Sequence, residues 1–434
     1  MEEVLEKARR RAEEAEVFSV HHTDTALTFE ANRLKMVETR ETSGLALRLI
    51  LGGHIGFSST TNLSDKDALV EHAVEMAPFG VASHLELPSA SAYAAVDVYD
   101  PQVETVGLEE MHHLGQRLID EVWKGWPEAQ FEGQVIRRRI QTRLINSRGC
   151  HTSLLKTVFS VYMEGVLIQD TDMLFVAESE ISCHPIKDAS HLRDSLLLQL
   201  ERASRIDQVP TRPMPVLFTP RGVAGLLLEP LLSGFSGKMA LRGTSPLIGR
   251  IGERVVDERV SLWDDPTRPY VPGSRPFDDE GVPSQATPLL QDGQAMNFLY
   301  DLQTAAQAGA RTTASASRSL TNLPSPAPAV LLLAPGDASF EDMLAGMGEG
   351  LVVERLLGAG QGNTLGGDFN ANVLLGYHVR GGQIAGRAKD VMVSGNVYDV
   401  LNNVVAIGKD TRWLGGFLNA PALYCDSVAV SARG

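Results

Sequence analysis

The sequence predicts an α+β fold, with an N-terminal domain of helices and an antiparallel sheet over residues 1–209 and a mostly β, glycine-rich domain over 210–434. In the first half, strands and helices occur in groups, without the regular alternation typical of a parallel sheet. The segment VPTRPMP at 209–215 holds three prolines, which favour an extended linker and mark the boundary. Beyond it, short apolar runs alternate with glycine turns, which is typical of β-structure.

The periodicity of apolar residues assigns the elements of the first half. Gly52 and Gly53 form a hairpin turn, Ser64 and Asp67 form a capping pattern, and Pro78 ends the helix that follows. An Ala-, Ser- and Pro-rich loop is expected over 82–102. The predicted order is a helix at 2–16, strands at 26–29, 33–39, 44–51 and 54–58, helices at 68–76 and 108–123, strands at 134–145, 151–165 and 166–178, and a helix at 192–206.

The second half is predicted to be mainly strands, with few helices. Apolar β-branched runs separated by Gly-Gly, Asp-Gly or Asn-containing turns indicate the strands. The clearest strands are expected at 216–218, 330–333, 373–379 and 391–393, and helices at 223–232, 301–308, 339–346 and 397–404.

Composition excludes several classes of protein. With 39 Lys plus Arg against 54 Asp plus Glu, the net charge is −15, which opposes binding to nucleic acid or to anionic lipid. The three cysteines lie far apart, so neither a disulfide framework nor a thiolate zinc site is expected. No apolar run is long enough to span a membrane, and the charged N-terminus does not resemble a secretory signal. We therefore expect a cytoplasmic protein without a membrane partner.

Common catalytic motifs fail at specific positions. The segment around Ser236 lacks the spacing of a nucleophile elbow. The glycine run at 358–368 lacks the lysine of a phosphate loop, so a tightly turned loop is the expected structure. The cluster of Cys183, His184 and His191 is expected to be a buried thiol beside surface imidazoles, and a metal site there is the alternative.

One basic feature interrupts the acidic pattern. Arg137, Arg139 and Arg143 alternate along one face of the predicted strand at 134–145. A solvated strand face is the simplest interpretation. The alternative is a face that meets an acidic partner subunit or the carboxylate end of a peptide.

Three sequence blocks resemble the TldD/PmbA (TldE) family. They are AEVFSVHHTDTALTFEANRLKMVETRETSGLALRLILGGHIGFSSTTNLS near the N-terminus, RGTSPLIGRIGERVVDERVSLWDDPT with FDDEGVPSQATPLLQDG in the middle, and GDFNANVLLGYHVRGGQIAGRAKDVMVSGNVYDVLNNVVAIGKD near the C-terminus. The blocks follow the family's order and span both halves. The resemblance implies a zinc metallopeptidase assembly with two kinds of subunit, a family also described as modulators of DNA gyrase.

The resemblance further implies that this chain has lost the metal site. In the TldD type, a HExxxH helix and a cysteine near the C-terminus hold zinc, and the glutamate accepts a proton from the bound water. The corresponding positions here are Glu229, Pro230 and Gly234. Cys425 lies past the position of the family's cysteine, where this chain has Leu414-Gly-Gly-Phe417. The pattern is similar to the PmbA/TldE type of subunit, without a zinc site of its own.

The expected function is therefore that of a non-catalytic subunit of a TldD/TldE-type peptidase acting on unfolded peptides. Zinc is expected only in a TldD-like partner subunit, and a homodimer is a second assembly that the sequence leaves open. A peptide backbone is expected to approach the glycine-rich segment at Gly360, Gly362, Gly366, Gly367 and Asp368. The alternatives are an independent peptidase that uses Cys183, His184 and His191, or Glu229 with Asp264 and Asp265, and a regulator of DNA gyrase.

Overall fold

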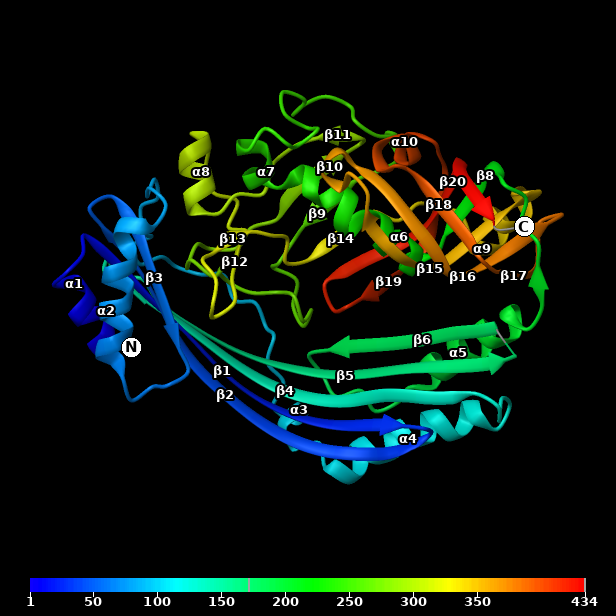
Figure 1. Cartoon of the computed structure of the whole chain (residues 1–434), viewed down its shortest axis with the longest axis horizontal. Helices are drawn as coiled ribbons and strands as arrows, with labels where there is room; N and C mark the ends of the chain where they lie inside the picture. Colours follow the sequence, from blue (N-terminus) through cyan, green and yellow to red (C-terminus); the bar gives the residue numbers. More distant parts are fainter. Residues whose placement is uncertain (171, 433–434) are drawn as a thin grey trace.

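The chain forms two large β-sheets, shown in a computed structural model that describes residues 1–170 and 172–432 (Figure 1). The strands of the first sheet all precede residue 183, and those of the second begin at residue 206. The α+β fold class is confirmed. The domain boundary near residue 210 stays a prediction.

The first sheet is antiparallel throughout, with strand order β3-β2-β1-β4-β5-β6. Its strands are β1 (Glu14–Glu30), β2 (Arg33–Leu51), β3 (His54–Thr60), β4 (Gln130–Asn146), β5 (His151–Gln169) and β6 (Asp172–Ser182). Gly52 and Gly53 both have positive φ, as the predicted hairpin turn requires. Most of the expected strands were right in place but too short. The two strands expected at 33–39 and 44–51 are one continuous strand, β2, and the strand expected at 166–178 spans the end of β5 and most of β6.

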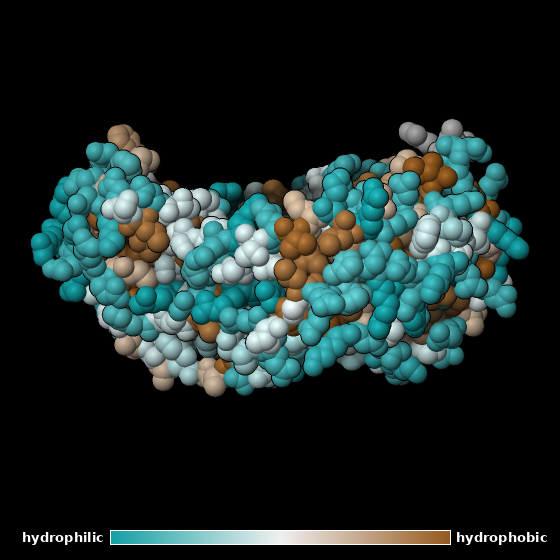
Figure 2. All heavy atoms as spheres, turned by 90° about the horizontal axis from the view of Figure 1, so that it is seen from below, coloured by the Kyte–Doolittle hydropathy of each residue, from teal (hydrophilic) through white to brown (hydrophobic). Residues whose placement is uncertain are grey.

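The helices of the first half are α1 (Glu2–Arg9), α2 (Lys66–Met76), α3 (Pro101–Thr105), α4 (Leu108–Trp123) and α5 (Ser190–Ala203). The prediction of a helix over 2–16 was wrong at its end, because Ala15 is already buried in β1. Helix α4 lies close to the sheet, since a Cβ at Gly115 would be 2.4 Å from the Phe29 ring. Figure 2 shows the elongated molecule from this side, with a hydrophobic area near the middle of a mostly hydrophilic face.

The second sheet has twelve strands, ordered β11-β10-β9-β14-β20-β8-β15-β16-β17-β7, with β18 beside β16 and β20 and β19 beside β20. The strands are β7 (Ile206–Asp207), β8 (Arg212–Phe218), β9 (Leu262–Asp264), β10 (Thr287–Gln291), β11 (Gln294–Ala295), β14 (Leu331–Leu333), β15 (Glu349–Gln361), β16 (Asp368–Arg380), β17 (Gln383–Ala388), β18 (Val391–Asn396), β19 (Val404–Leu414) and β20 (Leu418–Ala432). A separate pair consists of β12 (Ala316–Ser317) and β13 (Ser325–Pro326).

The predicted linker is partly wrong, because β8 begins inside it at Arg212. Pro213 lies where β8 pairs with β20 only, and pairing with β15 starts at Val216. Proline has no N–H to donate, so it is tolerated where one edge of a strand is unpaired. The prolines therefore extend the chain without excluding it from the sheet.

Short helices flank the second sheet: α6 (Pro220–Leu226), α7 (Gly237–Leu241), α8 (Leu302–Ala308), α9 (Phe340–Gly346) and α10 (Val397–Asn402). The predicted helix at 223–232 is interrupted. After α6 the backbone widens into a π-helical turn, Leu227–Leu231, and then tightens into a 3₁₀ turn, Leu232–Phe235. Pro230 lies inside this segment, where its missing N–H disfavours a regular α-helix. No helix among residues 1–170 and 172–432 is long and apolar enough to cross a membrane.

A buried charged cluster joins the first sheet to the second half. The Arg48 guanidinium contacts Glu16 at 3.1 Å and Glu280 at 2.6 Å, and both carboxylates are fully buried. Arg318 contacts Glu16 at 2.8 Å and lies 4.1 Å from the centre of the Phe18 ring. Two cations and two carboxylates thus balance in an interior where a lone charge would be costly.

Candidate functional site

A groove of about 510 Å³ brings together three segments that are distant in sequence. One wall is formed by α6 and the π-helical turn with Glu229, and another by the end of β15 from Arg355 to Gly360. The third side includes Leu414, the last residue of β19, with Gly415 and Phe417 of the turn that follows, and Ser179 of β6 closes the groove. The groove therefore lies where the two sheets meet.

Glu229 faces the glycine-rich end of β15. A Cβ atom at Gly360 would lie 1.8 Å from the Glu229 Oε2 atom, so only glycine leaves room for this carboxylate as it is placed. The Glu229 side chain is exposed. The groove thus places the exposed Glu229 carboxylate beside the small residues Gly358, Ala359 and Gly360.

Gly234 lies against Tyr398 of α10. A Cβ at Gly234 would be 2.1 Å from the Tyr398 hydroxyl, and a Cβ at Gly367 would be 2.8 Å from its ring. Among the residues that the structure describes, the Tyr398 hydroxyl has no hydrogen-bond partner, and burial raises its pKa. Tyr398 therefore occupies the space that an imidazole at position 234 would need.

No metal site is assembled in the described part of the chain, where no group of three or more His, Cys, Asp or Glu side chains is suitably placed. Cys425 is fully buried in β20, opposite Val216 of β8, and does not line the groove. Burial raises the pKa of the Cys425 thiol to about 12, so it stays protonated at neutral pH.

Of the predicted peptide-binding residues, only Gly360 lines the groove. Gly366 and Gly367 close a tight turn, in which Gly367 has a φ of 90°. The Asp368 carboxylate accepts a hydrogen bond from the Asn396 side chain at 2.9 Å. Gly362, with a φ of 129°, lies between β15 and this turn. These four residues shape the hairpin beside the groove.

The groove borders a buried ionic network that the sequence analysis missed. Glu178 of β6 contacts Arg221 of α6 at 2.6 Å and is also paired with Arg412 of β19. Arg221 in turn contacts Glu354 of β15 at 3.2 Å. Burial alone would raise the pKa of Glu178, but the two arginines outweigh it and lower the pKa. The signal in the sequence was a charge inside an apolar run, as at Glu354 in LVVERLL.

The predicted arginine face exists, but its charges are paired within the chain. Arg139 contacts Glu104 at 3.3 Å, and Arg137 donates a hydrogen bond to the Glu104 carbonyl at 2.9 Å. Arg143 contacts Glu2 at 3.3 Å. The partners of Arg137 and Arg139 belong to α3, so this end of the face is already covered.

The residues of the alternative peptidase site have separate partners. His184 Nδ1 lies 2.7 Å from Asp100, and His191 Nε2 lies 3.0 Å from Glu180. Cys183 is fully buried, and burial raises the pKa of its thiol to about 11. This arrangement is the buried thiol beside surface imidazoles that the sequence favoured.

Asp264 and Asp265 accept hydrogen bonds from the backbone around them. Asp264 accepts hydrogen bonds from the N–H groups of Ala329 and Val330, and burial raises its pKa to about 6. Asp265 accepts from Thr267 and pairs with Arg268 at 2.7 Å. Neither carboxylate lines the groove with Glu229.

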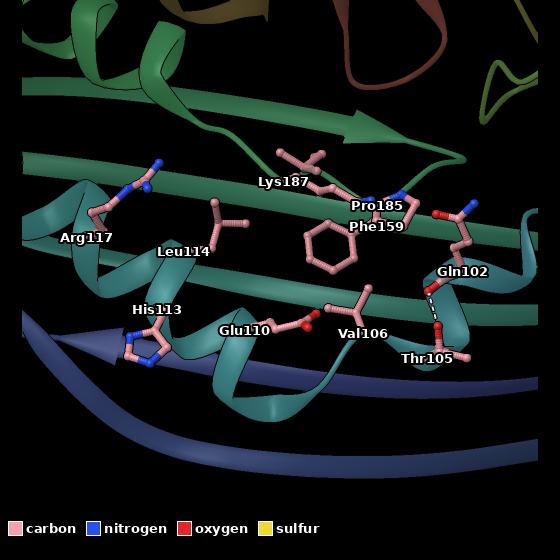
Figure 3. Close-up of a pocket in the computed structure, with 11 residues that line it drawn as sticks. Gln102, Thr105, Val106, Glu110, His113, Leu114, Arg117, Phe159, Pro185 and Lys187 are labelled. Carbon is pink, nitrogen blue, oxygen red and sulfur yellow. Dashed lines mark hydrogen bonds between the residues drawn. The ribbon is translucent and has the colours of Figure 1, made fainter.

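A second cavity, of about 580 Å³, lies on the outer side of the first sheet between α3, α4 and the loop after β6. Figure 3 shows Val106, Leu114 and Phe159 forming its apolar floor, with Glu110 and Lys187 at its sides. The charges at its rim have both signs and do not select one class of ligand.

Comparisons with known proteins agree with this architecture. Residues 211–432 match the family model described as the PmbA/TldA metallopeptidase C-terminal domain, and residues 15–77 match PmbA/TldA metallopeptidase domain 1. A metalloprotease of Methanothermobacter thermautotrophicus is 24% identical over 434 residues, covering 95% of this chain and 92% of the relative. A metalloprotease of Archaeoglobus fulgidus is 30% identical over 227 residues, or 50% of this chain and 52% of the relative.

Two solved structures share the whole fold. TldE from Thermococcus kodakarensis superposes with a TM-score of 0.90 at 20% identity, covering 100% of both chains. A Thermotoga maritima protein, whose name proposes a modulator of a DNA gyrase, superposes with a TM-score of 0.88 at 21% identity over 99% of each chain. With more than half of its length matched by one family model, this chain belongs to the PmbA/TldD metallopeptidase family.

Proposed function

We propose that this chain is a non-catalytic subunit of a TldD/TldE-type peptidase, which pairs with a zinc-bearing homologue and helps to hold an unfolded peptide. The observation that carries the proposal is the state of the groove at Glu229. The segments that resemble the zinc-holding parts of TldD-type chains border it, but Gly234 supplies no ligand, Pro230 supplies no general base, and Tyr398 fills the space beside Gly234. A catalytic zinc usually needs three protein ligands.

The edge of β15 supports peptide holding. Strand β8 pairs with β15 only from Leu351 to Val353, so beyond Glu354 this edge has no strand partner among the described residues. Strand β6 is likewise the last strand of its sheet. An extended peptide between them would find main-chain donors and acceptors, which give affinity with little dependence on sequence.

The test is reconstitution with a homologue that carries HExxxH. We expect the isolated chain to hold no stoichiometric zinc and to cleave no peptide. The mixture should form a heteromer with zinc in the partner only, and chelation should abolish its cleavage of unfolded peptides. Elemental analysis that finds one equivalent of zinc in the isolated chain, with proteolysis lost on chelation, would overturn the proposal. Sedimentation of the isolated chain separates a homodimer from a monomer.

The two alternatives have weaker support. For an independent peptidase, Cys183 would need a thiolate, and burial opposes its formation. A role in DNA topology would need a basic surface, and Arg137, Arg139 and Arg143 are engaged with carboxylates and carbonyls of the same chain. A salt-dependent shift of duplex DNA by the purified chain would favour the gyrase-related role.

A further inference from the structure

A small polar cavity of about 230 Å³ lies on the opposite face of β4 and β5 from α3. Ile140 and Thr142 of β4 alternate with the arginine face of that strand and line the cavity, together with Lys156 of β5. Loops of the second half close it, with Arg275 and Ser317 among the lining residues. The cavity therefore lies between the two halves of the chain.

Lys156 is the uncompensated cation at this cavity, since it has no ion pair among the described residues. Lys156 and Arg275 both line the cavity, and Asp279 is the one carboxylate that lines it, 3.5 Å from the Arg275 guanidinium. Arg275 also attracts the buried carboxylates of Asp264 and Asp278. Arg275 is only 9% exposed, and its Nε–H has no hydrogen-bond partner in the described residues. Lys156 Nζ donates to the Pro272 carbonyl at 2.5 Å. Burial lowers the pKa of Lys156 to about 8, which an anion in the cavity would reverse.

The cavity neighbours a hollow that in turn borders the groove at Glu229. Gly273 lines both the cavity and this hollow, which has a volume of about 370 Å³ and lies between β4, β5 and the loop at 272–273. That hollow shares Gly415 and Phe417 with the Glu229 groove. The three spaces thus follow one another along the junction of the two halves, with the cationic cavity at one end.

We propose that the cavity at Lys156 and Arg275 binds a carboxylate of the peptide that the groove holds, an inference that rests on the proposed function. The carboxylate belongs either to the peptide C-terminus or to an Asp or Glu side chain. A planar carboxylate matches the fork of a guanidinium, and one negative charge compensates the ammonium of Lys156, which has no ion pair among the described residues. Asp279 repels any anion in this cavity, but it repels a doubly charged phosphate about twice as strongly as a singly charged carboxylate.

The test uses the full chain and four extended peptides of one length, each carrying a dye at its N-terminus. One is neutral and amidated, one has a free C-terminal carboxylate, one is amidated with an internal Asp, and one has Asn in place of that Asp. We expect a carboxylate to tighten binding about tenfold, as measured by fluorescence anisotropy, which corresponds to about 1.4 kcal/mol. The peptide that gains affinity identifies the source of the carboxylate.

Lys156→Met should remove this preference while leaving the amidated peptide bound as before. Its melting temperature should be unchanged or higher, because Met keeps the apolar stem and removes a buried charge. Lys124→Met, at an exposed lysine after α4, is the matched control and should keep the preference. Equal loss of binding for all peptides in Lys156→Met would indicate a structural role and overturn the inference.

Binding by the wild-type chain separates a failure of the carboxylate site from a failure of the peptide-holding role. If the wild-type chain binds amidated and carboxylate peptides equally, the carboxylate site is wrong and the peptide-holding role stands. If it binds none of the four peptides, the peptide-holding role is also wrong.

Discussion

Removing Arg48 should destabilise the fold by an amount that grows with pH. In Arg48→Met, Glu16 keeps its pair with Arg318, but Glu280 loses the cation that contacts it. Burial raises the pKa of Glu280 to about 7, and Arg48 opposes that rise. Without Arg48 the carboxyl should hold its proton to still higher pH. Breaking a buried pair by removing one partner costs about 3–5 kcal/mol.

The dependence on pH follows from linkage. A carboxyl whose pKa is higher in the folded state stabilises the fold below its unfolded pKa, and this contribution is lost as pH rises through the folded pKa. In the wild type, the loss of stability that Glu280 causes as pH rises should end near pH 7, close to the pKa of this carboxyl in the folded state. In Arg48→Met it should continue above pH 7 at about 1.4 kcal/mol per pH unit. Between pH 7 and 9 this amounts to about 3 kcal/mol, which agrees with the cost of breaking the pair.

The assay is urea denaturation followed by tryptophan fluorescence, at pH 5.5, 7 and 9. The difference in unfolding free energy between wild type and Arg48→Met should be about 1 kcal/mol at pH 5.5 and at least about 3 kcal/mol at pH 9. Adding Glu280→Gln should remove the dependence of this difference on pH, and Arg143→Met, in an exposed pair, should show no resolvable loss. A difference that is equal at pH 5.5 and 9 would refute the reasoning.

Three further outcomes are expected. Gly360→Val should leave the melting temperature nearly unchanged, because the exposed Glu229 carboxylate can move away from the new side chain. The same variant should weaken peptide binding as measured by fluorescence anisotropy. Unchanged binding would show that the peptide does not contact Gly360. Gly234→His should lower the melting temperature, because its side chain clashes with the Tyr398 hydroxyl, and adding Tyr398→Ala should recover part of that loss. An unchanged melting temperature in Gly234→His would contradict the packing argument. The three cysteine thiols are buried, and burial raises their pKa values. They should therefore resist alkylation by iodoacetamide in the folded chain at pH 8 and should react in urea, as measured by mass spectrometry.

Strong periodicity made parts of the fold predictable. The helix expected over 108–123 coincides with α4, since its apolar residues form one continuous stripe. The helix expected over 2–16 ran too far because Ala15, a small residue, fits the inner face of a helix or of a strand equally well. Pro230 predicts an interruption of the helix expected over 223–232, but not that the backbone around it forms a π-helical turn.

The site was harder to predict than the elements, because its parts meet only through topology. Glu229, Gly360 and Phe417 are neighbours in the fold, and nothing in the local sequence of each points to the others. The contact between Gly234 and Tyr398 crosses most of the second half of the chain. A charged residue inside an apolar run, such as Arg48 in LALRLIL, indicates a buried ion pair from sequence alone, because buried charges are usually paired.

The packing of Tyr398 against Gly234 also bears on the history open to this chain. A single change that introduced histidine at position 234 would clash with the tyrosine hydroxyl before any metal could bind, so its first effect would be a loss of stability. A smaller residue at position 398 would have to come first, and that change alone would leave an unfilled space. Since each of these steps is unfavourable alone, this contact favours descendants that keep position 234 without a metal ligand over descendants that gain a metal site there.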